Sequence, residues 1–284
     1  MPTNGQFAVG ELVTASDANT LFTRGYQNRI INGAFVINQR GYTSTTNLAS
    51  GSYGFDRWKS GFTNTALTFT AGSQSTTVTI SSSGVLQQII ERENMPAGTY
   101  ILSWTGTATG RIYNSGATPP AYAAGPITVT LDGSANVVVE FTASGSTKTL
   151  GLVQLEAGTV YSPFEYRHRA DELALCQRYF IRFTGTNIFT IYGFTMAYSS
   201  VNASGLIHVP VTMRSNSITV TFQNLVLATA ALIAAVTNVT APANNGTTCI
   251  GLDWTVGSGL TSSTMYRVLS NNTATSHLSL EAEL

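Results

Sequence analysis

The chain is poor in charge. Charged residues make up 10% of its 284 residues, against about 25% in an ordinary soluble domain. Lys59 and Lys148 are its only lysines, and 14 basic and 14 acidic residues cancel to a formal net charge of zero. Nucleic-acid binding requires a basic face that attracts phosphate. The composition therefore argues against a nucleic-acid-binding protein.

Cysteine and long hydrophobic runs are also scarce. Cys176 and Cys249 are too few for a disulfide framework. The most apolar run, residues 225–236, is too short to cross a bilayer as a helix, and its composition leaves a helix and a strand pair both open. The N-terminus lacks the basic region and apolar core of a signal peptide. We therefore expect no membrane insertion.

The motifs of common active sites are missing as well. The three histidines form no zinc-type pair, and neither cysteine lies in a C-x-x-C motif. The sequence contains no G-x-S-x-G motif, no P-loop and no G-x-G-x-x-G motif. The acidic residues are too scattered to identify a hydrolase pair by spacing, so a pair in space such as Asp56 with Glu140 stays open. We expect a protein that is not an enzyme and that holds no metal and no cofactor.

What the sequence does contain is a long series of short β segments. Between residues 29 and 168 they are rich in β-branched and aromatic residues and are separated by Gly, Pro, Asn and Ser. In "TTVTI" and "PITVTL" threonine alternates with apolar residues, the period of a half-buried strand. A second series fills residues 181–284. We predict an all-β fold with a jelly-roll sandwich at 29–168 and a second β-sandwich-like domain at 181–284.

Charge crowds into one stretch between these domains, "SPFEYRHRADELALCQRYF" (162–180). Pro163 ends the preceding strand, and the acidic residues that follow precede an apolar i, i+3, i+7 pattern, which favours a short helix. We predict a linker helix within 169–180, centred on residues 170–178. We interpret the stretch as a joint that fixes the geometry between domains or subunits. The predicted joint residues are Arg167, Arg169, Asp171, Glu172, Leu173, Cys176 and Phe180.

The tryptophans admit two interpretations. A tryptophan on a strand usually belongs to the core, and we predict this for Trp58 and Trp104. For Trp254 the alternative is a platform on which a sugar ring stacks while neighbouring polar groups bind its hydroxyls. Asp253, the residue before Trp254, would face the opposite side of the strand. The candidate glycan contacts are Trp254, Asp253, Tyr266 and Arg267.

Several blocks of the sequence resemble one family. "NRIINGAFVINQRG" (28–41) and "YGFDRWKS" (53–60) resemble the start of the jelly-roll modules of phage fibre and minor structural proteins. "VQLEAGTVYSPFEYRHRADELALCQRYF" (153–180) resembles the closing strand and exit helix of that module. Residues 207–222 and the final "EAEL" are similar to the distal β domain, and residues 7–22 to virion-attachment segments. The resemblance touches most of the chain.

The resemblance implies a phage virion protein, a tail or capsid fibre or spike subunit that projects from the particle. It would mediate adsorption to the host surface through glycans, and it would form a homotrimer. Residues 1–28 would attach to other tail or capsid proteins of the virion. The attachment residues would be Phe7, Leu12, Leu21 and Phe22.

The first module also resembles carbohydrate-binding jelly rolls. Their N-G-x-F opening and later tryptophan match Asn32, Gly33, Phe35 and Trp58. Some such modules hold calcium through an acidic residue soon after this motif, where this chain has Val36 and Ile37. The alternative functions are a carbohydrate-binding protein without a virion role and a polysaccharide depolymerase.

Overall fold

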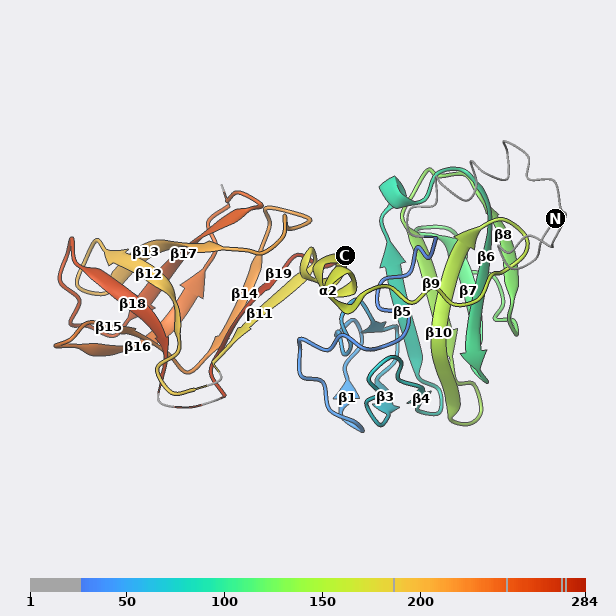
Figure 1. The fold of residues 1–284 in the computed structure, drawn as a ribbon, viewed down its shortest axis with the longest axis horizontal. Helices are drawn as coiled ribbons and strands as arrows, with labels where there is room; N and C mark the ends of the chain where they lie inside the picture. Colours follow the sequence, from blue (N-terminus) through green and yellow to red (C-terminus); the bar gives the residue numbers. More distant parts are fainter. Residues whose placement is uncertain (1–26, 186, 244, 272, 274) are drawn as a thin grey trace, which may run out of the picture. The chain divides into compact units, whose positions relative to one another are not determined.

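The computed structural model describes residues 27–284 except 186, 244, 272 and 274 (Figure 1). They form two compact units that divide between Glu172 and Leu173. Strands account for 43% of the described residues and helices for 5%, which confirms the all-β prediction. The four predicted attachment residues, Phe7 to Phe22, lie outside the described residues.

The first unit is a sandwich of two antiparallel sheets. One sheet has the strand order β1-β3-β4-β10-β6-β8 and the other β2-β5-β9-β7. From β4 onwards, successive strands alternate between the two sheets, which is the connectivity of a jelly roll. A 3₁₀ helix, Arg92–Asn94, follows β5. The strands are β1 (Asn47–Leu48), β2 (Lys59–Ser60), β3 (Thr65–Thr68), β4 (Val78–Ile80), β5 (Val85–Ile90), β6 (Gly98–Gly106), β7 (Thr109–Asn114), β8 (Ile127–Leu131), β9 (Val137–Thr142) and β10 (Lys148–Ala157).

The core between the two sheets follows the predicted alternation. On β4, Val78 and Ile80 are fully buried, whereas Thr79 between them is only partly buried. Trp58 is fully buried in this core and Trp104 packs against it half-buried, so the core prediction for Trp58 is confirmed. Burial of such large rings supplies much of the hydrophobic stabilisation.

Asn32 organises the opening motif. It is fully buried with φ 57°, a left-handed conformation that asparagine tolerates. Its side-chain oxygen accepts from the amides of Val36 and Ile37 at 2.9 Å, and its side-chain nitrogen donates to the carbonyls of Ile37 and Asp56. Its own carbonyl accepts from the indole of Trp58 at 3.0 Å. The motif is thereby anchored to the tryptophan in the core.

The next residue of the motif, Gly33, is a glycine because no side chain fits at this position. It lies against β10 at an irregularity between Gly151 and Gln154, and the amide of Val153 donates to its carbonyl at 2.9 Å. A Cβ at residue 33 would stand 2.1 Å from the carbonyl oxygen of Val153. The N-G pair of the motif therefore reflects a close approach of two backbones.

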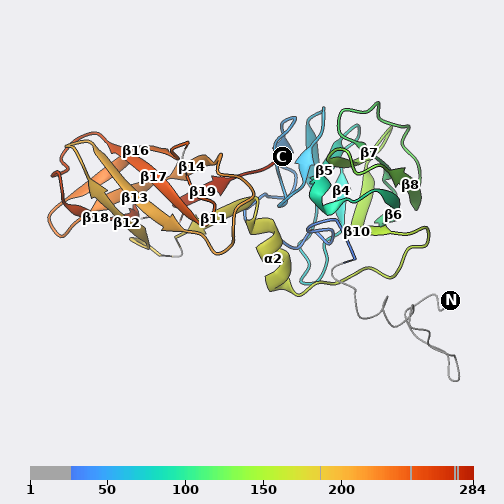
Figure 2. The same ribbon diagram turned by 90° about the horizontal axis from the view of Figure 1, so that it is seen from above.

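The second unit combines a closed barrel with a small sheet. The barrel order is β12-β13-β17-β16-β15-β18, and the sheet order is β11-β19-β14 (Figure 2). The apolar run at 225–236, left open by the sequence, forms the paired strands β15 and β16. The strands are β11 (Phe180–Thr184), β12 (Ile191–Ala197), β13 (Asn202–His208), β14 (Thr219–Gln223), β15 (Leu225–Ala228), β16 (Ile233–Thr240), β17 (Cys249–Val256), β18 (Met265–Ser270) and β19 (His277–Glu281).

The predicted helix is present as α2 (Arg169–Gln177). His168 caps it, because its carbonyl accepts from the amides of Asp171 and Glu172 and its ring Nδ1 accepts from Ala170. The helix ends before Phe180, which the sequence placed on its apolar face. Phe180 instead begins β11 and pairs with Glu281 of β19, because the apolar spacing continues past the point where the backbone becomes extended.

We predict that Gly33→Ala destabilises the first unit by about 1–3 kcal/mol, since the new methyl group must displace a backbone carbonyl. Gly98→Ala is the matched control, because a Cβ there meets only an ordinary contact, 3.9 Å from the ring of Tyr100. Urea unfolding followed by tryptophan fluorescence measures both. Equal midpoints for the two variants would contradict the close-approach explanation.

Candidate ligand-binding pocket

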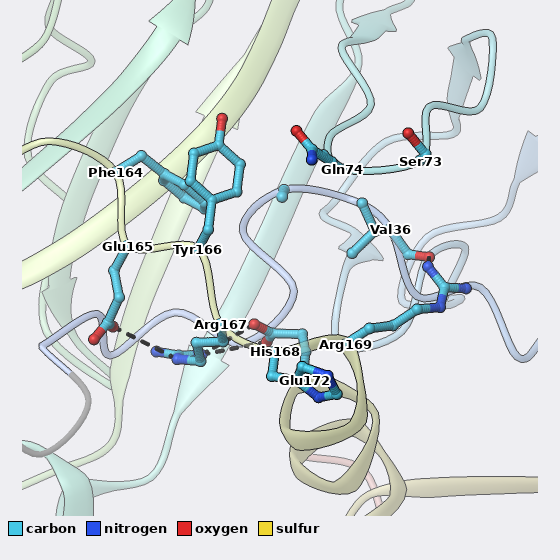
Figure 3. Close-up of a pocket in the computed structure, with 11 residues that line it drawn as sticks. Val36, Ser73, Gln74, Phe164, Glu165, Tyr166, Arg167, His168, Arg169 and Glu172 are labelled. Carbon is cyan, nitrogen blue, oxygen red and sulfur yellow. Dashed lines mark hydrogen bonds and ion pairs between the residues drawn. The ribbon is translucent and has the colours of Figure 1, made fainter.

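A pocket of about 490 Å³ lies on the first unit, within the ~300–1,000 Å³ range of small-ligand sites. Figure 3 shows the rings of Phe164 and Tyr166 together on one side, with Ser73 and Gln74 across from them. The two rings meet edge to face with their centroids 4.9 Å apart. The pocket residues are Ala34, Val36, Ser73, Gln74, Phe164, Glu165, Tyr166, Arg167, His168, Arg169 and Glu172.

The exit segment after β10 is held against its own strand by side-chain hydrogen bonds. Glu156 accepts from the amide and the hydroxyl of Ser162 at 2.7 and 2.8 Å. The side-chain oxygen of Gln154 accepts from the amide of Glu165 at 2.7 Å. Gln154 and Glu156 are buried, so these bonds form away from water and fix the path of residues 162–165. They thereby set the position of Phe164.

Arg167 binds this segment to the start of the unit. Its guanidinium donates to the carbonyls of Asn28 and Ile30 and lies 3.2 Å from the carboxylate of Glu172. Its side chain is only 3% exposed. Glu172 in turn accepts from the amide of Asn32 at 2.5 Å. We call these contacts of Arg167 and Glu172 with residues 28–32 the exit clasp.

The exit clasp leaves the pocket electrically balanced. Arg167 and Arg169 offset Glu165 and Glu172, and Arg167 is 3.6 Å from Glu165. Tyr166 is 59% exposed, so one ring of the aromatic pair is open to a ligand. Ser73, Gln74, His168 and Arg169 are exposed around it and carry hydrogen-bonding groups. The arrangement offers an apolar wall with polar groups at its rim and no net charge.

The predicted glycan contacts on the second unit are wrong. Trp254 is 1% exposed and Tyr266 is 2% exposed, and both pack in the barrel core. Neither ring is therefore accessible to a sugar. Asp253 and Arg267 lie on β17 and β18, which are not neighbours in the barrel. The four residues do not converge, because alternation along a strand fixes which neighbours face apart but not which face is the interior.

The predicted joint residues divide into groups. Arg167 and Glu172 form the exit clasp, and Arg169 donates to the carbonyl of Val36 at 3.2 Å. These contacts lie within the first unit. Asp171 is exposed on the first turn of α2 and Leu173 is partly buried. Cys176 and Phe180 are buried. A joint between domains or subunits stays a prediction.

A second polar cluster was not foreseen from the sequence. Glu140 on β9 is fully buried and accepts from Arg111 at 2.6 Å and from the hydroxyl of Tyr113 at 3.0 Å. The hydroxyl of Tyr122 also donates to it, and the guanidinium of Arg111 lies 4.1 Å from the centre of that ring. Burial together with the charge of Glu140 raises the pKa of Tyr113 to about 12, so its hydroxyl keeps its proton and its role as donor.

This cluster holds the loop that contains Tyr122 against the sheet. Arg111 and Glu140 face each other across the β7–β9 pair, a register that no local pattern reveals. The sequence left open a pair of Asp56 with Glu140. The Asp56 carboxylate is fully buried and instead accepts from the amide and the side chain of Gln39. Neither carboxylate borders the pocket.

The described residues contain no group of three or more His, Cys, Asp or Glu side chains placed to hold a metal ion. Among the same residues, no helix is long and apolar enough to cross a membrane. No protein-family model matches the chain, and no match was found among curated proteins.

We predict that Arg167→Ala destabilises the first unit by about 3–5 kcal/mol, because Glu172 and two carbonyls then lose their buried cationic partner. Arg169→Ala removes one exposed hydrogen bond and should change the free energy of unfolding by less than about 0.5 kcal/mol. Chemical denaturation measures both. A stability loss shared equally by the two variants would rule out a specific role for the exit clasp.

Proposed function

We propose that the chain is a bacteriophage virion structural protein, a tail or capsid fibre or spike subunit that attaches to host-surface glycans. The observation that carries the glycan part is the exposed ring of Tyr166 beside Phe164, at the edge of a pocket with a neutral polar rim. A flat ring stacks on the apolar face of a pyranose, while rim groups bind its hydroxyls.

The charge balance of the pocket favours a neutral sugar. Both carboxylates at the pocket lie close to Arg167, so no excess of positive charge remains to select a phosphate or an acidic sugar. Gln74 and Ser73 offer both donors and acceptors, which suits hydroxyl groups. The proposed role is binding without turnover, with no cofactor.

The virion part of the proposal is supported by how the resembling blocks meet. The block 28–41, the block 53–60 and the block 153–180 are separate in the sequence but join at one place. Asn32 of the first receives a hydrogen bond from Trp58 of the second and donates one to Glu172 of the third. The blocks therefore form one structural module, as the resemblance to a single module implies.

In this role the protein is assembled in the host cytoplasm and acts outside the cell on the particle. Its partners are further copies of itself, as a homotrimer, other tail or capsid proteins at the N-terminal segment, and a host glycan. A single open pocket of this kind binds weakly. Several copies on one particle raise the avidity by about 10²–10⁴-fold without stronger single contacts.

We expect Tyr166→Ala to weaken binding of the best glycan on an array by about tenfold or more, because stacking is lost, while Tyr166→Phe keeps most of it. Tyr161→Ala is the matched control, since Tyr161 is 54% exposed on the same loop but does not line the pocket. Isothermal titration with the selected glycan gives the affinities. Equal weakening by Tyr161→Ala would count against the pocket.

The virion role predicts that the protein is present in purified particles and that antibodies against the first unit block adsorption to the host. Mass spectrometry of gradient-purified particles and an adsorption assay measure these outcomes. A soluble protein that binds glycan but is absent from particles would indicate the carbohydrate-binding alternative. Loss of polysaccharide viscosity on incubation with the protein would indicate a depolymerase.

A further inference from the structure

The outer surface of the barrel carries a group of exposed apolar side chains. Their exposed fractions range from 53% for Phe194 to 65% for Met265. Singly exposed apolar residues are common on proteins, but a contiguous group marks an interaction surface. We define the barrel patch by its members on and next to β12, β13 and β18: Phe194, Met196, Tyr198, Leu206 and Met265.

The strand register makes the barrel patch contiguous. Phe194 lies directly opposite Leu206 on β13, and Met196 lies directly opposite Met265 on β18. Directly paired residues on one face have their Cβ atoms about 4.5–5.5 Å apart. Thr195, which alternates with the patch residues of β12, is 3% exposed and faces the barrel interior. The side chains of Phe194, Met196, Leu206 and Met265 therefore point outward from three adjacent strands.

The area of the barrel patch fits an interface. Five side chains of roughly 200 Å² each, a little over half exposed, present on the order of 500–600 Å² of mostly apolar surface. Two such surfaces placed together bury about 1,000–1,200 Å², which reaches the lower limit of specific protein interfaces. The area lies at the upper end of the roughly 300–600 Å² of the largest apolar patch on a typical monomer, which is often functional, and it is sufficient for a second copy of the same surface.

The charge pattern identifies the kind of partner. Arg267, which pairs with Phe194, is the charged residue of the three strands that form the patch. A nearly uncharged face offers little for a highly charged partner to recognise, and contact with an identical face brings only the exposed Arg267 of each copy to the interface. Because the barrel is closed, these strands have no free edges for strand addition. The contact must form through side chains, face to face.

We propose that the barrel patch is a self-association surface, on which Phe194, Met196, Leu206 and Met265 of one copy pack against the same residues of a second copy. The arrangement is isologous, so it joins copies in pairs and each apolar side chain contributes to the contact twice. It is therefore a contact separate from the threefold contacts of the proposed homotrimer. This inference does not depend on glycan binding or on a virion role. It concerns the second unit alone.

The test compares substitutions on opposite sides of the barrel in the full chain. Phe194→Asp places a charge at the centre of the patch and should raise the dissociation constant for self-association by about 30-fold or more. Ile233→Asp is the matched control, because Ile233 is 58% exposed on β16, which is separated from β12 by two strands in either direction around the barrel. It should leave the constant unchanged. Analytical ultracentrifugation over a concentration series measures all three proteins.

Leu206→Ser provides a second patch variant that removes apolar area without adding charge, and circular dichroism checks that each variant is folded. Leu206→Ser should also weaken self-association, by a smaller factor than Phe194→Asp. A wild-type chain that remains monomeric up to about 100 μM would overturn the proposal. So would association that both patch variants retain in folded form, or that Ile233→Asp weakens as much as Phe194→Asp.

Discussion

The hydrogen bonds of Asn32 are the constraint on which the first unit and its pocket depend. Its side chain holds residues 36, 37 and 56, its carbonyl receives the indole of Trp58, and its amide donates to Glu172. Asn32 is fully buried, so each lost bond leaves a polar group without water to replace it, at a cost of about 1–3 kcal/mol. The opening loop, the tryptophan core and the exit segment therefore form together or not at all, and the pocket lies between the first and the last of them.

This dependence explains where the few charges of the chain are used. Arg167, Glu172 and Glu140 have almost entirely buried side chains. Arg167 and Glu172 bind backbone groups of residues 28–32, and Glu140 binds the side chains of Arg111 and Tyr113. A buried charge is stable only with such partners. The crowding of charge at residues 162–180 thus reflects a structural need first. The candidate pocket follows from it, because Gln154 and Glu156 fix the segment that carries Phe164 while the exit clasp holds the residues that follow Tyr166.

The two units present different surfaces. The first offers a concave site with one exposed ring and polar neighbours, suited to weak and selective binding of a small ligand. The second offers a broad apolar face on a closed barrel, suited to contact with another protein surface. Weak binding gains most when copies act together, so a chain that associates through its barrel and binds ligand through its sandwich would gain avidity from both.

The local patterns of the sequence determined the all-β class, the start of the short helix and the burial of Trp58, because period-two alternation and helix-start signals depend only on near neighbours. They left the strands within 225–236 open and extended the helix too far, to Phe180. Tertiary structure decided which faces turn inward: Trp254 and Asp253 had to face opposite ways, yet only barrel closure placed Trp254 inside. It also decided the candidate pocket, because Arg167 reaches a carbonyl 139 positions away in the chain. Strand pairing and register arise from such long-range contacts, and no local period encodes them. The pocket and the barrel patch could therefore be found only in the folded chain.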